Sequence, residues 1–246
     1  LAVQDLIIKL LSGSYPLHEV MFVRTSIAMV IILAVMRVEV GWGGLRTNRA
    51  GAHVARGVLI VIANSAYFLA LAAMPLAEAM AVFFVAPLII TALSALILKE
   101  PVGPRRWAAV AVGMLGVIAI LRPGGETFSP VTLLPVLGAI AYAIMQVITR
   151  RLGATDPAST MALYVQMTFM VVCLTMYNVA GDGAFADGDD PSLQFLLRAW
   201  VVPSTYDAGV MVLVGIIHGA SSYLLTQAYR SAAPSVVAPF EYTALP

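Results

Sequence analysis

The sequence has 246 residues, of which 61% are hydrophobic and 11% are charged, and its formal net charge is +1. Soluble domains are about 45–50% apolar, so this composition excludes an ordinary water-soluble globular protein. The nearly balanced charge provides no strongly basic surface, and we expect no nucleic-acid partner.

Seven hydrophobic stretches are long enough, or nearly so, to cross a hydrocarbon core of about 30 Å. In chain order they are residues 17–36, 57–73, 76–98, 107–121, 132–149, 159–179 and 209–228. Two further stretches, residues 1–11 and 232–246, are too short to span. We interpret them as the end of a first helix and the start of a ninth, so the chain is expected to be truncated at both ends.

Basic residues fall almost entirely in every second gap between these stretches, and the positive-inside rule places such gaps in the cytoplasm. The pattern predicts a multi-pass protein of the bacterial cytoplasmic (inner) membrane, with the N-terminus of the complete protein in the cytoplasm. The basic gaps contain Arg37, Arg46, Arg49 and Arg56, then Lys99, Arg105 and Arg106, then Arg150 and Arg151, and finally Arg230. The only basic residues assigned to the intervening gaps are Lys9, Arg122 and Arg198.

The long gap of residues 180–207 is acidic and is predicted to lie outside. It lacks the closing Glu of a calcium loop, so we interpret it as a solvated loop with a short helix from Pro191 to Leu197 and with Trp200 at the interface. Cys173 is the single cysteine in the sequence, so an intrachain disulfide is excluded. It lies in a hydrophobic stretch, which makes a thiol–metal site implausible. We expect no metal and no cofactor.

The second half of the chain weakly repeats the first. Gln4, Lys9 and Arg24 align with Gln146, Arg151 and Gln166, and Ser65 and Tyr67 align with Ser221 and Tyr223. The alignment pairs helix 1 with helix 6, which is five helices further along the chain. Because five is an odd number of membrane crossings, the two copies face opposite ways across the membrane. Inverted repeats with a site at their interface are typical of secondary transporters.

Several motifs occur in an order that resembles the EamA type of the drug/metabolite transporter superfamily. They are Pro16-Leu17 with Phe22-Val23-Arg24, then Tyr67-Phe68-Leu69-Ala70-Leu71, Val85-Ala86-Pro87-Leu88, Gly113 with Gly116, and Ala238-Pro239-Phe240-Glu241-Tyr242. The resemblance covers nearly the whole chain.

This resemblance implies an all-α integral membrane protein, a ten-helix bundle of two inverted five-helix repeats. About seven full and two partial helices are present. The first repeat covers residues 1–123 with helix 1 truncated. The second covers residues 130–246, with helix 9 truncated and helix 10 missing. The implied activity is the carriage of small metabolites, and not an enzymatic reaction.

Polar residues near the middle of the predicted helices are the candidates for substrate binding or coupling, because such groups are costly in a bilayer and need partners. They predict a polar cavity near the bilayer midplane, lined by Arg24, Asn64, Tyr67, Tyr142, Gln146, Gln166, His218 and Glu241.

Each of these candidates also has a structural interpretation. Arg24 can reach the outer interface by snorkelling. The amides and His218 can join helices by hydrogen bonds, and Tyr67 can pack in the core. Glu241 is the best candidate for proton coupling or for pairing with Arg24.

The sequence therefore predicts a secondary active transporter of a small metabolite that works by alternating access. Arg24 favours an anionic or zwitterionic substrate, and the segment Phe240-Glu241-Tyr242 resembles members that take up ring-containing metabolites. An intramembrane enzyme and a non-transporting membrane component or channel remain the alternatives. His218-Gly219-Ala220-Ser221 is only superficially similar to a serine intramembrane protease, and no His-Glu-x-x-His metal motif is present.

Overall fold

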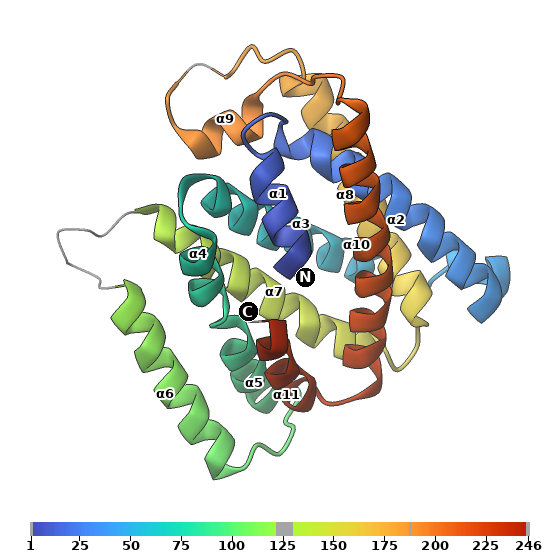
Figure 1. The fold of residues 1–246 in the computed structure, drawn as a ribbon. Helices are drawn as coiled ribbons and strands as arrows, with labels where there is room; N and C mark the ends of the chain where they lie inside the picture. Colours follow the sequence, from blue (N-terminus) through green and yellow to red (C-terminus); the bar gives the residue numbers. More distant parts are fainter. Residues whose placement is uncertain (1, 122–129, 187, 245–246) are drawn as a thin grey trace.

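The computed structural model describes residues 2–121, 130–186 and 188–244, and this part of the chain is helical and contains no strand (Figure 1). Arg122 and Asp187, as well as the last two residues of the predicted ninth helix, lie outside the described residues.

The first half contains six α-helices and one 3₁₀ helix. They are α1 (Ala2–Leu11), α2 (Leu17–Glu39), η1 (Gly41–Leu45), α3 (Ala50–Ala73), α4 (Leu76–Phe83), α5 (Ala86–Ile97) and α6 (Pro104–Leu121). The second half contains η2 (Pro130–Thr132), α7 (Leu133–Leu152), α8 (Ala158–Ala180), α9 (Pro191–Leu197), α10 (Thr205–Ser231), α11 (Pro234–Val237) and η3 (Ala238–Ala244).

Six segments of the described chain are long and apolar enough to cross a membrane, which confirms the predicted all-α membrane protein. They are Leu17–Glu39, Ala50–Ala73, Leu76–Ile97, Pro130–Leu152, Ala158–Ala180 and Thr205–Ser231. Each contains, or nearly contains, one of the predicted stretches. The seventh predicted stretch, residues 107–121, forms most of α6, which lies at the side of the bundle against α4 and α5 (Figure 1).

The third of these spans is broken in the middle. The sequence predicts one helix over residues 76–98 with a proline in it, and the structure has two helices, α4 and α5, with Pro87 in the first turn of α5. A proline has no N–H to donate, and its ring collides with the carbonyl one turn earlier, so the helix ends and restarts. The carbonyl of Phe84, at the break, accepts a hydrogen bond from the Tyr242 hydroxyl at 3.2 Å.

The predicted start of a ninth helix is only partly helical. The described residues 232–244 contain the four-residue helix α11 and the 3₁₀ helix η3 in place of a regular α-helix. A continuous α-helix through this segment would need an N–H at residue 239 to donate to Ser235 O, and Pro239 has none, so α11 ends before it. Glu241 therefore lies on a 3₁₀ helix, not at the centre of an α-helix as the sequence analysis expects.

The four basic gaps meet at one end of the bundle, which we call the basic end. Arg151 Nη2 donates to Ile97 O at 3.1 Å, and Arg150 Nε lies 3.6 Å from Glu100 Oε1. Arg150 Nη1 also donates to Arg230 O at 2.8 Å, and Arg230 Nε donates to Asp156 O at 3.0 Å. Thr47 Oγ1 donates to Asp156 Oδ1 at 2.7 Å, which connects the fourth gap. The alternation that the sequence shows is therefore an alternation between the two ends of the molecule.

The intervening gaps meet at the opposite end. Lys9 Nζ donates to Leu71 O at 2.6 Å, and Tyr15 donates to Asp207 Oδ2 at 2.7 Å. The predicted short helix is confirmed as α9, where the Asp190 carboxylate caps the first turn by accepting from Leu193 N at 2.9 Å. Trp200 packs its ring against Tyr177, Phe22 and His18.

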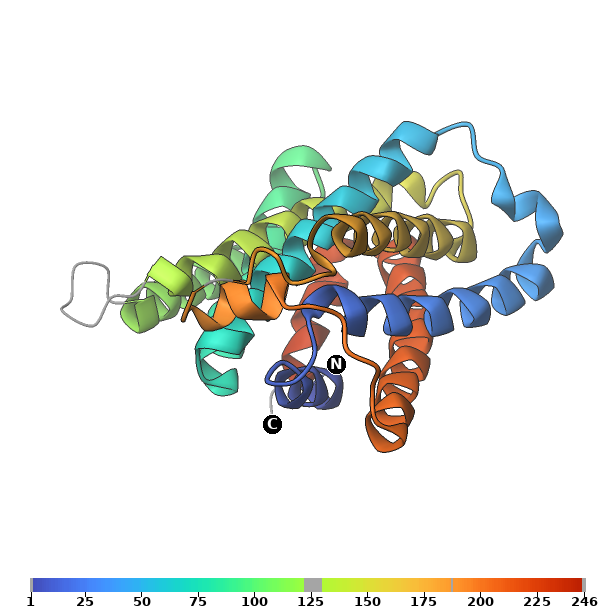
Figure 2. The same ribbon diagram turned by 90° about the horizontal axis from the view of Figure 1, so that it is seen from above.

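The two halves of the chain are interleaved and do not form separate bodies. Helix α2 packs along α8 and α10, and α3 packs along α7 and α8 (Figures 1 and 2). Gly138 of α7 allows the close approach to α3, because a Cβ atom there would lie 2.9 Å from Ala63 O. Small residues at such crossings are the usual way in which membrane helices pack closely.

Candidate functional site

A cavity of about 160 Å³ lies among helices of both halves. Six of the eight predicted site residues line it: Asn64, Tyr67, Tyr142, Gln146, His218 and Glu241. They come from α3, α7, α10 and η3, so the fold brings together polar groups that are far apart in the sequence. The other two, Arg24 and Gln166, lie directly behind the lining.

Glu241 is held by two tyrosine hydroxyls. Tyr142 donates to Oε1 at 2.9 Å and Tyr229 donates to the same oxygen at 2.5 Å. The hydrogen bonds bind η3 to α7 and α10. The carboxylate therefore has tyrosines as its direct partners in this structure, and Arg24 is not among the partners of Oε1.

Arg24 points into the bundle. Its side chain is buried, with 1% of its surface exposed, and the guanidinium carbon lies 5.7 Å from the ring centroid of Phe68 and 5.4 Å from that of Phe169. Both rings line the cavity, and a desolvated cation over an aromatic face is attracted by about 2 kcal/mol. Among the described residues no hydrogen-bond partner meets its guanidinium nitrogens. Snorkelling to the interface is thus excluded, and a charged group remains beside the cavity with its donors available.

Gln166 connects two helices behind the cavity. It is fully buried, its Nε2 donates to Ser222 Oγ at 3.4 Å, and the same atom lies 3.4 Å from His218 Nε2. Because Ser222 and His218 both line the cavity, Gln166 orients two lining residues of α10.

Aromatic rings form one wall of the cavity. The ring centroid of Tyr67 in α3 lies 5.5 Å from that of Phe68 and 4.9 Å from that of Phe83 in α4. The Phe83 centroid in turn lies 5.8 Å from that of Tyr142 in α7. All four line the cavity, and their tilted packing has the favourable geometry for aromatic pairs. We call these four residues the aromatic wall.

The sequence does not predict several of the lining residues, and two of these, Arg56 and Asp5, have ionisable side chains. Hydropathy places Arg56 in a basic gap, but it lies in α3 with 2% of its surface exposed. Its Nε donates to Thr149 Oγ1 at 2.7 Å and its Nη1 to Met161 O at 2.8 Å. Asp5 lies in α1, a stretch set aside as too short to span, although an acid inside an apolar stretch is itself a signal. The remaining polar residues missed are Gln4, Ser221, Ser222 and Thr226.

The lining thus combines charges of both signs with aromatic surface. Asp5 and Glu241 contribute carboxylates, Arg56 contributes a guanidinium, and Arg24 adds a second one behind two rings. Among the described residues, no group of three or more His, Cys, Asp or Glu side chains is placed to hold a metal ion. Such an arrangement is suited to reversible binding of a small organic molecule that carries both a ring and polar groups.

Comparisons with known proteins show what this chain is similar to. The model of the EamA-like transporter family matches residues 1–122. A riboflavin transporter from Rhizobium johnstonii is 30% identical over 95% of this chain and 71% of the relative. An S-adenosylmethionine uptake transporter from Rickettsia prowazekii is 24% identical over 99% of this chain and 76% of the relative. A pseudopaline exporter from Pseudomonas aeruginosa is 24% identical over 98% of this chain and 78% of the relative.

The fold is also found among solved structures. A crystal structure of a protein that is 20% identical superposes with a TM-score of 0.67 over 98% of this chain and 81% of the other. With the membrane-spanning helices and the relatives taken together, the chain is a multi-pass membrane protein that belongs to the EamA-like transporter family of the drug/metabolite transporter superfamily.

Proposed function

We propose that this protein is a secondary active transporter that moves a small metabolite across the bacterial cytoplasmic membrane. Alternating access takes place between two inverted repeats, residues 1–123 and 130–246, and the basic end faces the cytoplasm. The observation that carries the proposal is the cavity, to which α1, α3 and α4 of the first half and α7, α8, α10 and η3 of the second contribute polar or aromatic residues. A carrier needs its site at such an interface because relative movement of the halves then exposes it to each side in turn.

The substrate is a compound with a planar ring and with polar groups of both signs. The aromatic wall offers a stacking surface, and the two carboxylates and two guanidinium groups in and behind the lining suit a zwitterion. Riboflavin and S-adenosylmethionine, which relatives are named for, both contain planar heterocycles, and they are the first probes to use.

Glu241 is the residue that binds a proton or a hydrogen-bond donor of the substrate. Tyr142 and Tyr229 both donate to Oε1, so the second oxygen can accept from a molecule in the cavity. Two fixed hydroxyls hold the carboxylate in one orientation, which lowers the cost of ordering it on binding.

The test is uptake by the purified full chain in proteoliposomes, with radiolabelled riboflavin and S-adenosylmethionine supplied separately. We expect saturable uptake of at least one probe, and a loss of about tenfold or more in Glu241→Gln, because removing a charge-assisted contact costs about 1.4 kcal/mol or more. Glu78→Gln, at an exposed carboxylate in the first turn of α4, is the matched control and should transport normally. Equal uptake by Glu241→Gln and the parent would show that Glu241 is not part of the site. If neither riboflavin nor S-adenosylmethionine is taken up, the proposed substrate class is wrong.

A further inference from the structure

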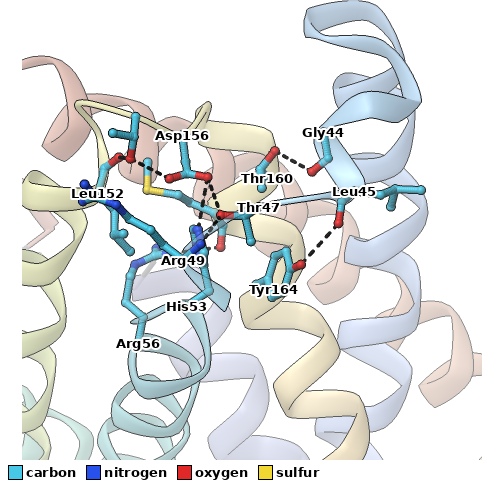
Figure 3. Close-up of polar contacts among 12 residues, drawn as sticks. Gly44, Leu45, Thr47, Arg49, His53, Arg56, Leu152, Asp156, Thr160 and Tyr164 are labelled. Atoms are coloured by element: carbon cyan, nitrogen blue, oxygen red, sulfur yellow. Dashed lines mark hydrogen bonds and ion pairs between the residues drawn. The ribbon is translucent and has the colours of Figure 1, made fainter. Parts of the chain in front are cut away.

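Asp156, in the connection between α7 and α8, is the centre of a hydrogen-bonded cluster at the basic end (Figure 3). Its Oδ1 accepts from Thr47 Oγ1 at 2.7 Å and lies 3.5 Å from His53 Nε2, and its Oδ2 accepts from Thr155 Oγ1 at 2.7 Å. Its backbone carbonyl accepts from Arg230 Nε at 3.0 Å. One residue thus joins the connection between α2 and α3, helix α3 itself, and the end of α10.

Contacts around this cluster hold the connection between α2 and α3 against α8. Thr160 donates to Gly44 O at 2.8 Å, and Tyr164 donates to Leu45 O at 3.2 Å (Figure 3). The His53 ring, which is fully buried, stacks on Tyr164 with 4.9 Å between centroids. Every one of these contacts joins an element of the first half of the chain to an element of the second.

A second layer lies between this cluster and the cavity. Arg56 is one helical turn further along α3 than His53, it lines the cavity, and it binds Thr149 of α7 and Met161 of α8. Between the cavity and the basic end, Arg56 connects α3 to α7 and α8, and Asp156 then connects α3 to the loop between α7 and α8.

Asp156 is ionised in this arrangement. Burial raises its pKa, but the hydrogen bonds from Thr155 and Thr47 and the neighbouring His53 together outweigh burial and leave the pKa below its usual value. The contacts to Thr47 are therefore charge-assisted and stronger than those between neutral groups.

We propose that Asp156, with Thr47 and His53, is a gate that closes the substrate cavity on the cytoplasmic side, and that transport requires these contacts to break. The inference rests on the proposed function, because only alternating access requires the two halves to separate at this end. The gate is suited to reversible opening, because it consists of a few polar contacts that water replaces when the loops part.

The first test measures access to the cavity from the cytoplasmic side, and it does not require a known substrate. Cys173 is the single cysteine in the sequence, so Cys173→Ala gives a cysteine-free background. Ser221→Cys then places a thiol in the cavity lining. In inside-out vesicles, a membrane-impermeant maleimide should label this thiol slowly in the parent.

Asp156→Ala should raise that labelling rate by about tenfold, the change expected when one charge-assisted contact no longer favours the closed state. Asp156→Asn keeps an acceptor oxygen and should raise the labelling rate less than Asp156→Ala does. Thr47→Val removes the hydroxyl that donates to Asp156 and should also raise the labelling rate. Arg49→Gln, at an exposed side chain in the same loop, is the control and should label as the parent does. Gel filtration of each variant distinguishes an opened gate from a misfolded protein. Unchanged labelling in folded Asp156→Ala would overturn the proposal.

The second test locks the gate. In the cysteine-free background, Thr47→Cys and Asp156→Cys replace two side chains whose oxygens are 2.7 Å apart, and oxidation joins the two loops. We expect oxidation to stop transport and reduction to restore it, whereas each single variant should be insensitive to oxidation. Undiminished transport by the oxidised pair would show that the loops need not separate, and the gate would be wrong.

The two tests separate failure of the gate from failure of the proposed function. Flux that is unaffected by the lock contradicts the gate alone. A labelling rate that responds to Asp156→Ala, in a protein that transports neither probe, supports the gate and contradicts only the proposed substrate class.

Discussion

Arg24 illustrates how a single buried charge constrains function. Its guanidinium is enclosed by the rings of Phe68 and Phe169, and its nitrogens meet no hydrogen-bond donor or acceptor among the described residues. A cation is costly in this environment, so it persists where its charge is used. We infer that its field acts on molecules and carboxylates in the adjoining cavity.

Substitutions of Arg24 should show whether uptake depends on the charge of this side chain or on its shape. Arg24→Met keeps the length of an unbranched side chain and packs between the two rings, so we expect a folded protein whose uptake falls by about tenfold or more, as for loss of one charged contact. Arg24→Lys keeps the charge but not the planar group, and it should retain part of the uptake. Proteoliposome uptake and gel filtration measure the two properties. Normal uptake by Arg24→Met would mean that the charge is not used.

Asp156 makes a prediction about pH. Its pKa in the folded protein is lowered, so its contribution to stability is present above its unfolded pKa of about 3.9 and is lost as the pH falls through the lower folded value. At neutral pH, Asp156→Asn should lower the unfolding free energy by about 1–3 kcal/mol, and the difference from the parent should shrink on acidification below about pH 4.

Thermal unfolding in detergent across this pH range provides the measurement. Asp189→Asn, at an exposed acidic side chain of the outer loop, should match the parent at every pH. A difference between Asp156→Asn and the parent that stays constant down to the lowest pH would contradict the lowered pKa.

At the scale of elements, the sequence predicts the spans well and their ends less well. Hydropathy places the second span at residues 57–73, but α3 begins seven residues earlier, at Ala50. The missing part contains His53 and Arg56, whose polar side chains indicate a loop when only neighbours in sequence are considered. Their partners, Asp156, Thr149 and Met161 O, are about a hundred residues away, and no local pattern shows that these side chains are satisfied.

The break between α4 and α5 lies at Pro87, the proline that the sequence places inside the third predicted stretch. Phe83, Phe84 and Pro87 at this break all line the cavity, so the interruption shapes the site. Backbone without regular helical bonds is tolerated at membrane depth where it borders a cavity, and here the Tyr242 hydroxyl binds the Phe84 carbonyl.

Pro87→Ala should therefore restore a helical N–H and favour one continuous helix over residues 76–97. We expect equal or higher thermal stability, because a proline inside a helix costs about 3 kcal/mol, together with uptake lowered by several-fold. The control is Pro104→Ala, at the first residue of α6, where a proline is tolerated and where uptake should not change. Faster uptake in Pro87→Ala would contradict a role for the break in the site.

At the scale of the whole molecule, the alternation of charge along the chain becomes a separation of charge in space. The four basic gaps are connected to one another by hydrogen bonds and ion pairs at the basic end, and the cavity lies deeper, between helices of both halves. The sequence predicts this separation because it depends only on order along the chain. It does not predict the composition of the cavity fully, since Phe83 and Asp5 become lining residues only through packing of distant helices, as does the contact of Tyr229 with Glu241.

Counterflow tests the central claim, that the cavity is the site of a carrier with alternating access, most directly. Proteoliposomes containing the full chain are loaded with an unlabelled substrate, diluted into a trace of the same labelled compound, and followed over time. A carrier should accumulate label transiently above the equilibrium level, because each outward passage of unlabelled substrate returns the site for labelled substrate, and Glu241→Gln should abolish this overshoot. Label that only equilibrates, at the same rate with and without internal substrate, would contradict alternating access and indicate a passive pathway.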